Sequence, residues 1–415
     1  MTGASPIRQH FNMRRFNIPR FFLKKGASSF HHILWVVAIA LALGIGPATQ
    51  AWQEARIEQV QTENISTAEF SRIIREFSEE DGFFRSDNFV SNETSYLHVV
   101  DKLRALGGGG GAYVGVGPEQ NFTYIAKMRP RIAFIVDIRR QAMIQHLMLK
   151  AIFQLSENRA EFLSRLVSRP LTGEDVPGRG APVDKILAYL SASPASEEYF
   201  AANLASIRKL IQNEIQFPLS AHDHQSLEYV FTAFRQEGLD IQYRSGTGNW
   251  GGPQWAGFPS LKELVLESDL HGRLGNFLVT DEDYAFVRDL QRRNRIIPVV
   301  GNFSGTKAMA AVADYLKKNG YTVTGFYTSN VEQYLFANGT FAAFVENVRK
   351  LPITEKSLFI RAFPNMREPH PARIPGHRLT TLLQRISDFL QDYDKSLYPD
   401  YWSLVTTHYI AADEP

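Results

Sequence analysis

A glycine turn and an acidic residue in the first half of the chain have the types and the spacing to hold a nucleotide-like ligand. Gly115 and Gly117 frame a turn that follows an apolar run, and Asp137 comes 20 residues after Gly117. Glycine lacks a Cβ, so the backbone at such a turn can approach a ligand closely, and the carboxylate can accept hydrogen bonds from two ribose hydroxyls. The spacing therefore predicts a nucleotide-like ligand. The alternative is a ligand-free α/β fold that uses glycine for a tight turn.

Further polar residues are candidates for the same site. Glu119 and Asn121 continue the glycine loop, and Asn302 stands next to Phe303 after another apolar run. A polar side chain beside an aromatic ring can grip an amine, although Asn302 can equally cap a helix. Ser329 follows a further apolar run, and it too could line the mouth of a site or cap the helix after it.

The elements that must position these residues form an alternating series. Ala112–Asp137 is predicted to be a strand, a turn, a helix and a second strand. Further strands are predicted at Leu239–Arg244, Ile296–Val300, Tyr321–Tyr327, Ser357–Phe363 and Ser403–Ile410. This alternation predicts an α/β fold with a doubly wound, Rossmann-like parallel sheet. Ligands of such sheets lie beyond the carboxyl ends of the strands, so we expect a small-molecule cleft where Gly117, Asp137 and Asn302 meet.

Helices are expected between these strands, with two conspicuous loops. Apolar residues at helical spacing predict helices at Ser95–Leu106, Arg139–Leu155, Thr306–Lys318, Phe341–Leu351 and Thr380–Tyr393. A mostly helical insertion is expected at about 157–238, interrupted by a turn-rich break at Leu171–Pro182. Phe83–Thr94 is rich in aromatic and hydrogen-bonding side chains and could fold over a ligand, or simply start a capped helix. Ser245–Pro259 holds two tryptophans among glycines, which suggests a lid or rim, or an ordinary solvent loop.

The composition excludes several classes of protein. The chain has 415 residues, 44% of them hydrophobic and 21% charged, which is ordinary for a globular protein with a full core. A net charge of only +2 gives no strong field for nucleic acid, and we expect no nucleic-acid partner. There is no cysteine, so disulfides, thiol catalysis and cysteine-type zinc sites are excluded.

Residues 1–51 have the pattern of a signal peptide or an N-terminal membrane anchor. Basic residues without an acid come first, then an apolar run over residues 33–45, then small residues that could be cleaved after Ala51. The uncharged stretch is about 20 residues long, so residues 33–51 could also remain as a membrane tether. We therefore expect export to the periplasm or cell exterior, or anchoring with the C-terminal domain outside. Residues 52–111 would form a helical lead-in to an α/β domain at 112–415.

Gln120 narrows the ligand class. It stands where the third glycine of the dinucleotide fingerprint would fall, and that glycine allows close helix–strand packing around a pyrophosphate. Its absence weakens a nicotinamide or flavin interpretation, whereas S-adenosylmethionine has no pyrophosphate. A G-x-G loop after the first strand and an acid ending the second resemble class I methyltransferases. This resemblance implies a sheet of that type and S-adenosylmethionine as the cofactor.

Longer segments carry a second resemblance. Ala112–Ala126 with its GVGPEQNF sequence, Phe134–Gln141, and Tyr327–Leu335 with the sequence YTSNVEQYL are similar to an exported or membrane-associated family that looks like methyltransferases and has no established activity. The similarity covers roughly Glu79–Phe363. The methyltransferase resemblance implies cofactor contacts by Gly115, Gly117, Glu119, Asn121, Asp137 and Asn302. Methyltransferases usually carry an acid two residues before the first glycine; Tyr113 occupies that place here, and Glu119 is the candidate to replace it.

The sequence leaves three functions open. The first is an S-adenosylmethionine-dependent transferase acting on an unknown small molecule or envelope component, with no catalytic residue assigned. The second is a non-catalytic ligand-binding module that reuses the cleft, and the third is a nicotinamide-dependent oxidoreductase. His222, His224, Asp269 and His271 match no zinc spacing, so no metal is expected. A phosphate-binding P-loop and a Ser-His-Asp nucleophile pattern are both absent from the sequence.

Overall fold

The computed structural model describes residues 64–107, 109–245, 257–365 and 368–412. The chain divides into two units between Thr62 and Glu63, and the fold set out below is that of the second, Glu63–Pro415. The segment expected to be a signal peptide or an anchor, residues 1–51, lies outside the described residues. Within the described ranges, no helix is both long enough and apolar enough to cross a membrane.

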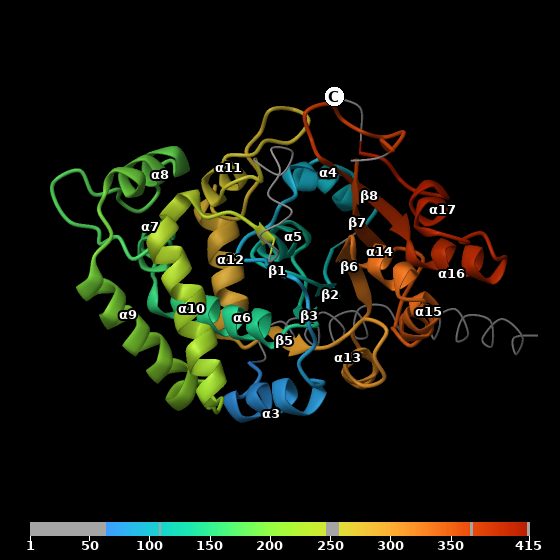
Figure 1. The fold of residues 1–415 in the computed structure, drawn as a ribbon, viewed down its shortest axis with the longest axis horizontal. Helices are drawn as coiled ribbons and strands as arrows, with labels where there is room; N and C mark the ends of the chain where they lie inside the picture. Colours follow the sequence, from blue (N-terminus) through green and yellow to red (C-terminus); the bar gives the residue numbers. More distant parts are fainter. Residues whose placement is uncertain (1–63, 108, 246–256, 366–367, 413–415) are drawn as a thin grey trace, which may run out of the picture. The chain divides into compact units, whose positions relative to one another are not determined.

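A six-stranded, mostly parallel sheet organises the second unit (Figure 1). The strands lie in the order β5-β3-β2-β6-β7-β8, and only β8 runs antiparallel, against β7. Their bounds are β2 (Ala112–Gly115), β3 (Ile132–Asp137), β5 (Ile296–Val300), β6 (Val323–Ser329), β7 (Leu358–Pro364) and β8 (Leu379–Arg385). The α/β, Rossmann-like class expected from the sequence is confirmed, with one antiparallel strand added at the edge.

The strands next to the glycine turn are buried along their whole length. Every residue of β2, β3 and β5 is buried. Their sequences are nearly continuous apolar runs rather than alternating ones, which is typical of parallel strands covered by helices on both faces. The carboxyl ends of β2, β3, β5, β6 and β7 therefore point to one edge of the sheet, as the sequence predicted.

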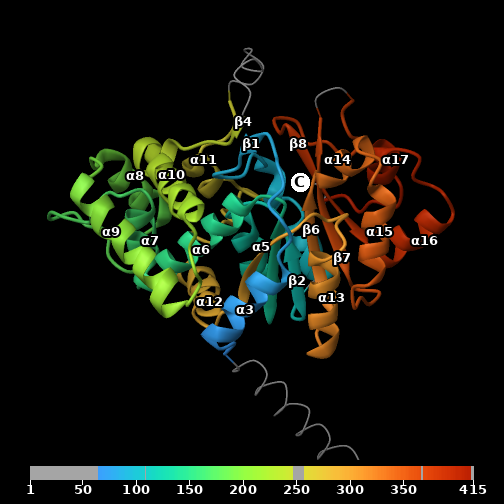
Figure 2. The same cartoon turned by 60° about the horizontal axis from the view of Figure 1, so that its bottom comes forward.

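Helices cover the sheet on two sides (Figure 2). On one side lie α5 (Gln120–Met128), α6 (Arg140–Leu155) and α12 (Asp281–Arg292), which pack against one another; on the other lie α13 (Ala308–Lys318), α15 (Phe341–Arg349) and α16 (Ile386–Asp394). Aromatic side chains fill both layers. Phe122 and Phe153 join α5 to α6 on the first side, and Phe389 of α16 packs against Phe344 and Phe359 on the second.

Helices also occupy the range 157–238, where we expected them. They are α7 (Arg159–Leu166), α8 (Val183–Ala192), α9 (Glu197–Lys209), the π-turn η2 (Leu210–Glu214) and α10 (Ala221–Glu237), followed by a 3-10 turn, η3 (Gly238–Asp240). The remaining elements are α3 (Thr67–Phe77), η1 (Thr94–Leu97), α4 (Val100–Ala105), α11 (Leu261–Val265), α14 (Val331–Ala337), α17 (Tyr401–Thr406) and a small antiparallel pair, β1 (Ser86–Asp87) with β4 (Arg244–Ser245).

The sequence-based assignment of the C-terminal elements was wrong in two places. The predicted helix Thr380–Tyr393 is a strand, β8, followed by α16. Of the predicted strand Ser403–Ile410, the first half belongs to the helix α17, and Ile410 forms an isolated antiparallel bridge with Leu383. β8 forms because the exposed edge of β7 needs a partner, a long-range requirement that helical spacing cannot reveal. α17 begins where Asp400 accepts a hydrogen bond from the backbone N–H of Ser403 at 2.8 Å, a local cap that outweighs the β-propensity of the residues after it.

Two smaller predictions also need correction. The helix expected at Ser95–Leu106 is split into η1 and α4, and the strand expected at Leu239–Arg244 is reduced to the end that enters β4. The split has a packing cause, because the Ser95 hydroxyl lies 2.8 Å from the Thr381 hydroxyl of β8 and fixes the first turn against that strand. The predicted lid at Ser245–Pro259 lies mostly outside the described residues.

Candidate functional site

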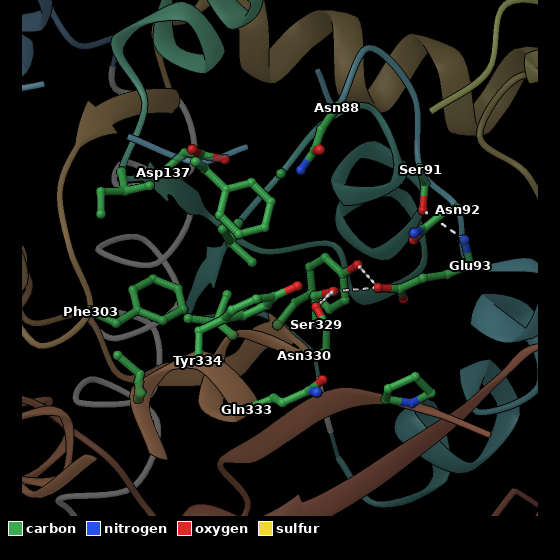
Figure 3. Close-up of a pocket in the computed structure, with 18 of the residues that line it drawn as sticks. Asn88, Ser91, Asn92, Glu93, Asp137, Phe303, Ser329, Asn330, Gln333 and Tyr334 are labelled. Carbon is green, nitrogen blue, oxygen red and sulfur yellow. Dashed lines mark hydrogen bonds between the residues drawn. The ribbon is translucent and has the colours of Figure 1, made fainter. Parts of the chain in front are cut away.

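A cavity of about 900 Å³ opens at the carboxyl ends of the parallel strands (Figure 3). Its walls come from the loop Phe83–Thr94 before η1, the glycine turn after β2, the ends of β3, β5, β6 and β7, and the helix α14. Three residues singled out from the sequence for a cofactor line it together: Gly117, Asp137 and Asn302. Since this is the edge where a doubly wound sheet holds its ligand, the cavity is the candidate site.

The glycine turn is held in shape by Asn121. Its side-chain amide donates to the carbonyls of Val116, Gly117 and Pro118 at 2.9, 3.2 and 2.8 Å, and its oxygen accepts the Tyr113 hydroxyl at 2.9 Å. Asn121 is fully buried and does not line the cavity. Its contacts in the structure shape the loop, and the cofactor contact expected of Asn121 stays a prediction.

The two glycines of the turn have different structural roles. A Cβ on Gly115 would lie 2.0 Å from Oδ1 of Asn121, so Gly115 makes room for that side chain and stays outside the cavity lining. Gly117 has φ +77°, a conformation that side chains rarely adopt, and a Cβ there would meet open space. Of the two, only Gly117 presents its backbone to the cavity.

Asp137 is buried at the tip of β3 and is bound by a neighbour in sequence. Oδ1 accepts the backbone N–H of Arg139 at 3.0 Å and its Nε at 3.1 Å, and Oδ2 accepts Nη2 at 3.1 Å. Burial alone would raise the pKa of Asp137, but the Arg139 guanidinium outweighs burial and holds that pKa below its ordinary value. The carboxylate is thus ionised. It lines the cavity, but Arg139 already donates hydrogen bonds to both of its oxygens.

Glu119 does not reach the cavity. Its Oε1 accepts the backbone N–H of Ser91 at 3.1 Å, and its Oε2 is a buried atom with no hydrogen-bond partner among the described residues. Burial raises the pKa of Glu119 to about 7. The expected replacement for the acid missing at Tyr113 is therefore turned into the protein, where it ties the glycine turn to the preceding loop.

Asn302 lines the cavity but also completes a turn. Its Oδ1 accepts the backbone N–H and the hydroxyl of Ser304 at 3.0 and 2.9 Å, and its own N–H donates to Glu79 at 2.9 Å. The neighbouring Phe303 is 3% exposed and packs edge-on against Phe326 at 5.1 Å between ring centres. Asn302 therefore lines the cavity and closes a turn, but it does not cap a helix as the sequence alternative had it, because α13 begins at Ala308 with Lys307 at the N-cap position.

A buried glutamate in the same cavity was missed by the sequence reasoning. Glu93 is 1% exposed, and its carboxylate accepts the Ser329 hydroxyl at 2.5 Å, the Tyr327 hydroxyl at 2.8 Å and the Gln120 amide at 3.0 Å (Figure 3). Burial raises the pKa of Glu93, and the three donors oppose that shift. The only sequence signal was the polar loop Phe83–Thr94, which does fold along the cavity.

Aromatic rings form much of the remaining wall. The aromatic residues that line the cavity, besides Phe303 and Tyr327, are Phe83, Phe84, Tyr243, Phe258, Tyr334, Phe363, Tyr401 and Trp402. Phe84 and Tyr334 meet edge-on with ring centres 5.2 Å apart, and Phe83 is 87% exposed. The cavity therefore suits a ligand with a large apolar or planar part and a few polar groups.

The sequence matches the domain of unknown function DUF7790 over residues 88–170 and 183–410. These two segments cover well over half of the chain. The chain belongs to the DUF7790 family. The interval between the matched segments, 171–182, coincides with the turn-rich break expected from the sequence, and the DUF7790 match includes Glu93, Gly117, Asp137, Asn302 and Ser329. No curated protein matches the chain.

Proposed function

We propose that the cavity binds S-adenosylmethionine and that the chain is a transferase of the class I methyltransferase type. The observation that carries this proposal is the meeting of Gly117, Asp137 and Asn302 in one cavity at the carboxyl edge of a parallel sheet. These are residues that the pattern of a glycine turn, an acid and a third strand end assigned to a nucleoside cofactor. The acceptor is an unknown small molecule or envelope component; the envelope part rests on the export-type pattern of residues 1–51.

The order of the strands supports the proposal. Numbered from the glycine turn, the five parallel strands follow the order 3-2-1-4-5 of nucleotide-binding doubly wound sheets. The sixth strand, β8, is antiparallel, whereas the sixth strand of the nicotinamide-binding order continues in parallel. An antiparallel last strand is consistent with the methyltransferase type of sheet and favours it over an oxidoreductase.

The dimensions and lining of the cavity fit such a ligand. About 900 Å³ is enough for a nucleoside with an amino acid attached. Asp137 can accept a ribose hydroxyl, and the open space above Gly117 lets the backbone approach the ligand. S-adenosylmethionine, when bound, supplies an electrophilic methyl sulfonium. The chain contributes proximity, by holding an acceptor against the wall formed by Asn302 and Ser329.

A non-catalytic binding module is the second candidate. It is favoured by the state of the residues expected to contact a cofactor: Asn121 donates only to loop carbonyls, Glu119 is turned inward, and Asp137 is paired with Arg139. In that case the cleft holds a ligand without transferring a group.

Calorimetry separates these candidates. The protein is titrated with S-adenosylmethionine, with its demethylated product and with NAD. The transferase proposal expects binding of the first two and none of NAD. Binding of the demethylated product alone, with no methyl transfer to any added acceptor, would favour the binding module, and absence of all S-adenosylmethionine binding would overturn the proposal.

A further inference from the structure

Ser329 has a backbone conformation that serine adopts only under constraint. Its φ is +53°, in the left-handed region, and it sits where β6 turns sharply into α14. Seven non-glycine residues of the described chain have positive φ, and Ser329 is the one among them that lines the cavity. A strained serine at a strand-to-helix turn on the carboxyl edge of an α/β sheet is the arrangement that exposes a nucleophilic hydroxyl.

The Ser329 hydroxyl donates its hydrogen bond to a buried carboxylate. It donates to Oε1 of Glu93 at 2.5 Å, from a loop 236 residues earlier in the chain. Because the glutamate is buried, its carboxylate is poorly solvated and accepts a proton more readily than one in water. Figure 3 shows the two side chains pointing toward each other inside the cavity.

Glu93 is itself oriented by other residues. The Tyr327 hydroxyl donates to the same oxygen at 2.8 Å, and the Gln120 amide donates to Oε2 at 3.0 Å. Gln120 is held in turn by the hydroxyl of Ser91. A nucleophile, a base within hydrogen-bond reach and groups that fix the base are the three parts that nucleophilic catalysis requires.

We propose that Ser329 is a nucleophile and Glu93 its general base, in the hydrolysis of carboxylic esters. The serine Oγ forms a bond to the ester carbonyl carbon as its proton passes to the Glu93 carboxylate. The alcohol then leaves with that proton, and an acyl-serine remains. Water attacks the acyl carbon, gives its proton to Glu93, and the carboxylic acid departs as the serine regains its proton. No oxidant, metal or cofactor enters this balance.

The surrounding wall defines the substrate class. Tyr334, Phe363 and Trp402 line the same cavity as the serine, so the acyl or alcohol part is expected to be apolar. Asn92 and Asn330 also line the cavity (Figure 3), and their side-chain N–H groups are the candidate donors to the developing oxyanion.

This activity does not rest on the proposed cofactor. Asp137 ends β3 and Ser329 ends β6, with β2 between them, so the two sites are two strand spacings apart, roughly 10 Å. A nucleoside at the β3 end leaves the β6 end of the cavity accessible. Failure of S-adenosylmethionine binding would therefore leave the esterase proposal intact, and the reverse also holds.

A fluorophosphonate probe tests the proposal, because it forms a stable adduct only with an activated serine. We expect one adduct on Ser329 by peptide mass spectrometry, together with hydrolysis of p-nitrophenyl butyrate. Both are lost in Ser329→Gly, which keeps the fold because glycine accepts the same φ without strain. Labelling falls at least tenfold in Glu93→Gln. Thr340→Ala is the matched control: it also removes a hydroxyl of the cavity, but one that donates to the carbonyl of Leu335, so labelling persists.

The possible outcomes are decisive in either direction. No adduct on Ser329 of the folded wild-type chain overturns the proposal, as does an adduct that forms at the same rate in Glu93→Gln. If Glu93→Gln fails to fold, Tyr327→Phe removes only one hydroxyl that orients the base. In that variant, a labelling rate several-fold below wild type supports the role of Glu93, and an unchanged rate contradicts it.

Discussion

Arg139 occupies three of the four acceptor positions of the Asp137 carboxylate, through its backbone N–H, its Nε and its Nη2. One lone pair, on Oδ2, remains for a ligand. Asp137 can therefore accept one ribose hydroxyl rather than the two expected from the sequence. The same guanidinium donates to the carbonyl of Ser86 at 2.9 Å, so the acid in the cleft is coupled to the loop that covers it.

Replacing Asp137 by Asn is expected to affect stability and binding separately. The charge of Arg139, buried with its partner, would lose that partner, which costs about 3–5 kcal/mol of unfolding free energy. The double variant Asp137→Asn with Arg139→Met should recover much of this loss, because no buried charge is then left alone. Urea denaturation measures the difference; equal stability of the single and double variants would contradict the coupling. Both variants should bind S-adenosylmethionine at least tenfold more weakly.

Alanine substitutions at Gly115 and Gly117 should differ in how much they reduce stability and how much they reduce ligand affinity. At Gly115 the new Cβ would lie 2.0 Å from Asn121 and 2.7 Å from the ring of Tyr113, so the loop must rearrange at a cost of about 1–3 kcal/mol. At Gly117 there is room, and only the strain of φ +77° remains, about 1 kcal/mol. Thermal unfolding should therefore rank Gly115→Ala as the less stable variant. Because Gly117 faces the cavity, Gly117→Ala should lose more ligand affinity, relative to its loss of stability, than Gly115→Ala. The opposite ranking of the two variants would contradict the different roles assigned to the two glycines.

Lys150, which does not line the cavity, should make the unfolding free energy of the fold depend on pH. It is 1% exposed beside the ring of Phe70, and burial lowers its pKa to about 7. The folded pKa lies below the ordinary value of 10.5, so between pH 7 and about 10 the unfolded chain binds more protons and stability rises with pH.

The variant Lys150→Met isolates this effect. Relative to it, the wild-type chain should gain about 2 kcal/mol of unfolding free energy between pH 7 and pH 9. Urea denaturation at the two pH values provides the comparison, and the variant supplies the background pH dependence of all other groups. A difference between the two proteins that does not change with pH would show that Lys150 is protonated in the folded state.

The part of the site that the sequence predicted is the part encoded locally. Gly117, Asp137 and the strands before them lie within one βαβ unit, where the spacing of glycine, apolar run and acid reflects the geometry directly. The placement of Asn302 followed from the rule that parallel strands end at one edge. Even here, the pattern did not reveal that Gly115 makes room for Asn121, or that Arg139 would take most of the Asp137 carboxylate.

The rest of the site depends on contacts between distant segments. Glu93 meets Ser329 only because its loop packs against the tip of β6, 236 residues later in the chain. No local sequence pattern marks a single glutamate for that position. The same reason explains the errors at the C-terminus. β8 is a strand because β7 offers an unpaired edge, although the spacing of apolar residues in Thr380–Tyr393 is also compatible with a helix.

Hydrogen–deuterium exchange with and without S-adenosylmethionine reports both whether the proposed cofactor binds and where it binds. We expect slower exchange in peptides that contain the glycine turn at Val116–Pro118, the Asp137–Arg139 segment and the loop around Asn302, with little change on α8 and α9. Unchanged exchange in all three segments at saturating S-adenosylmethionine, or protection confined to another part of the chain, would contradict it.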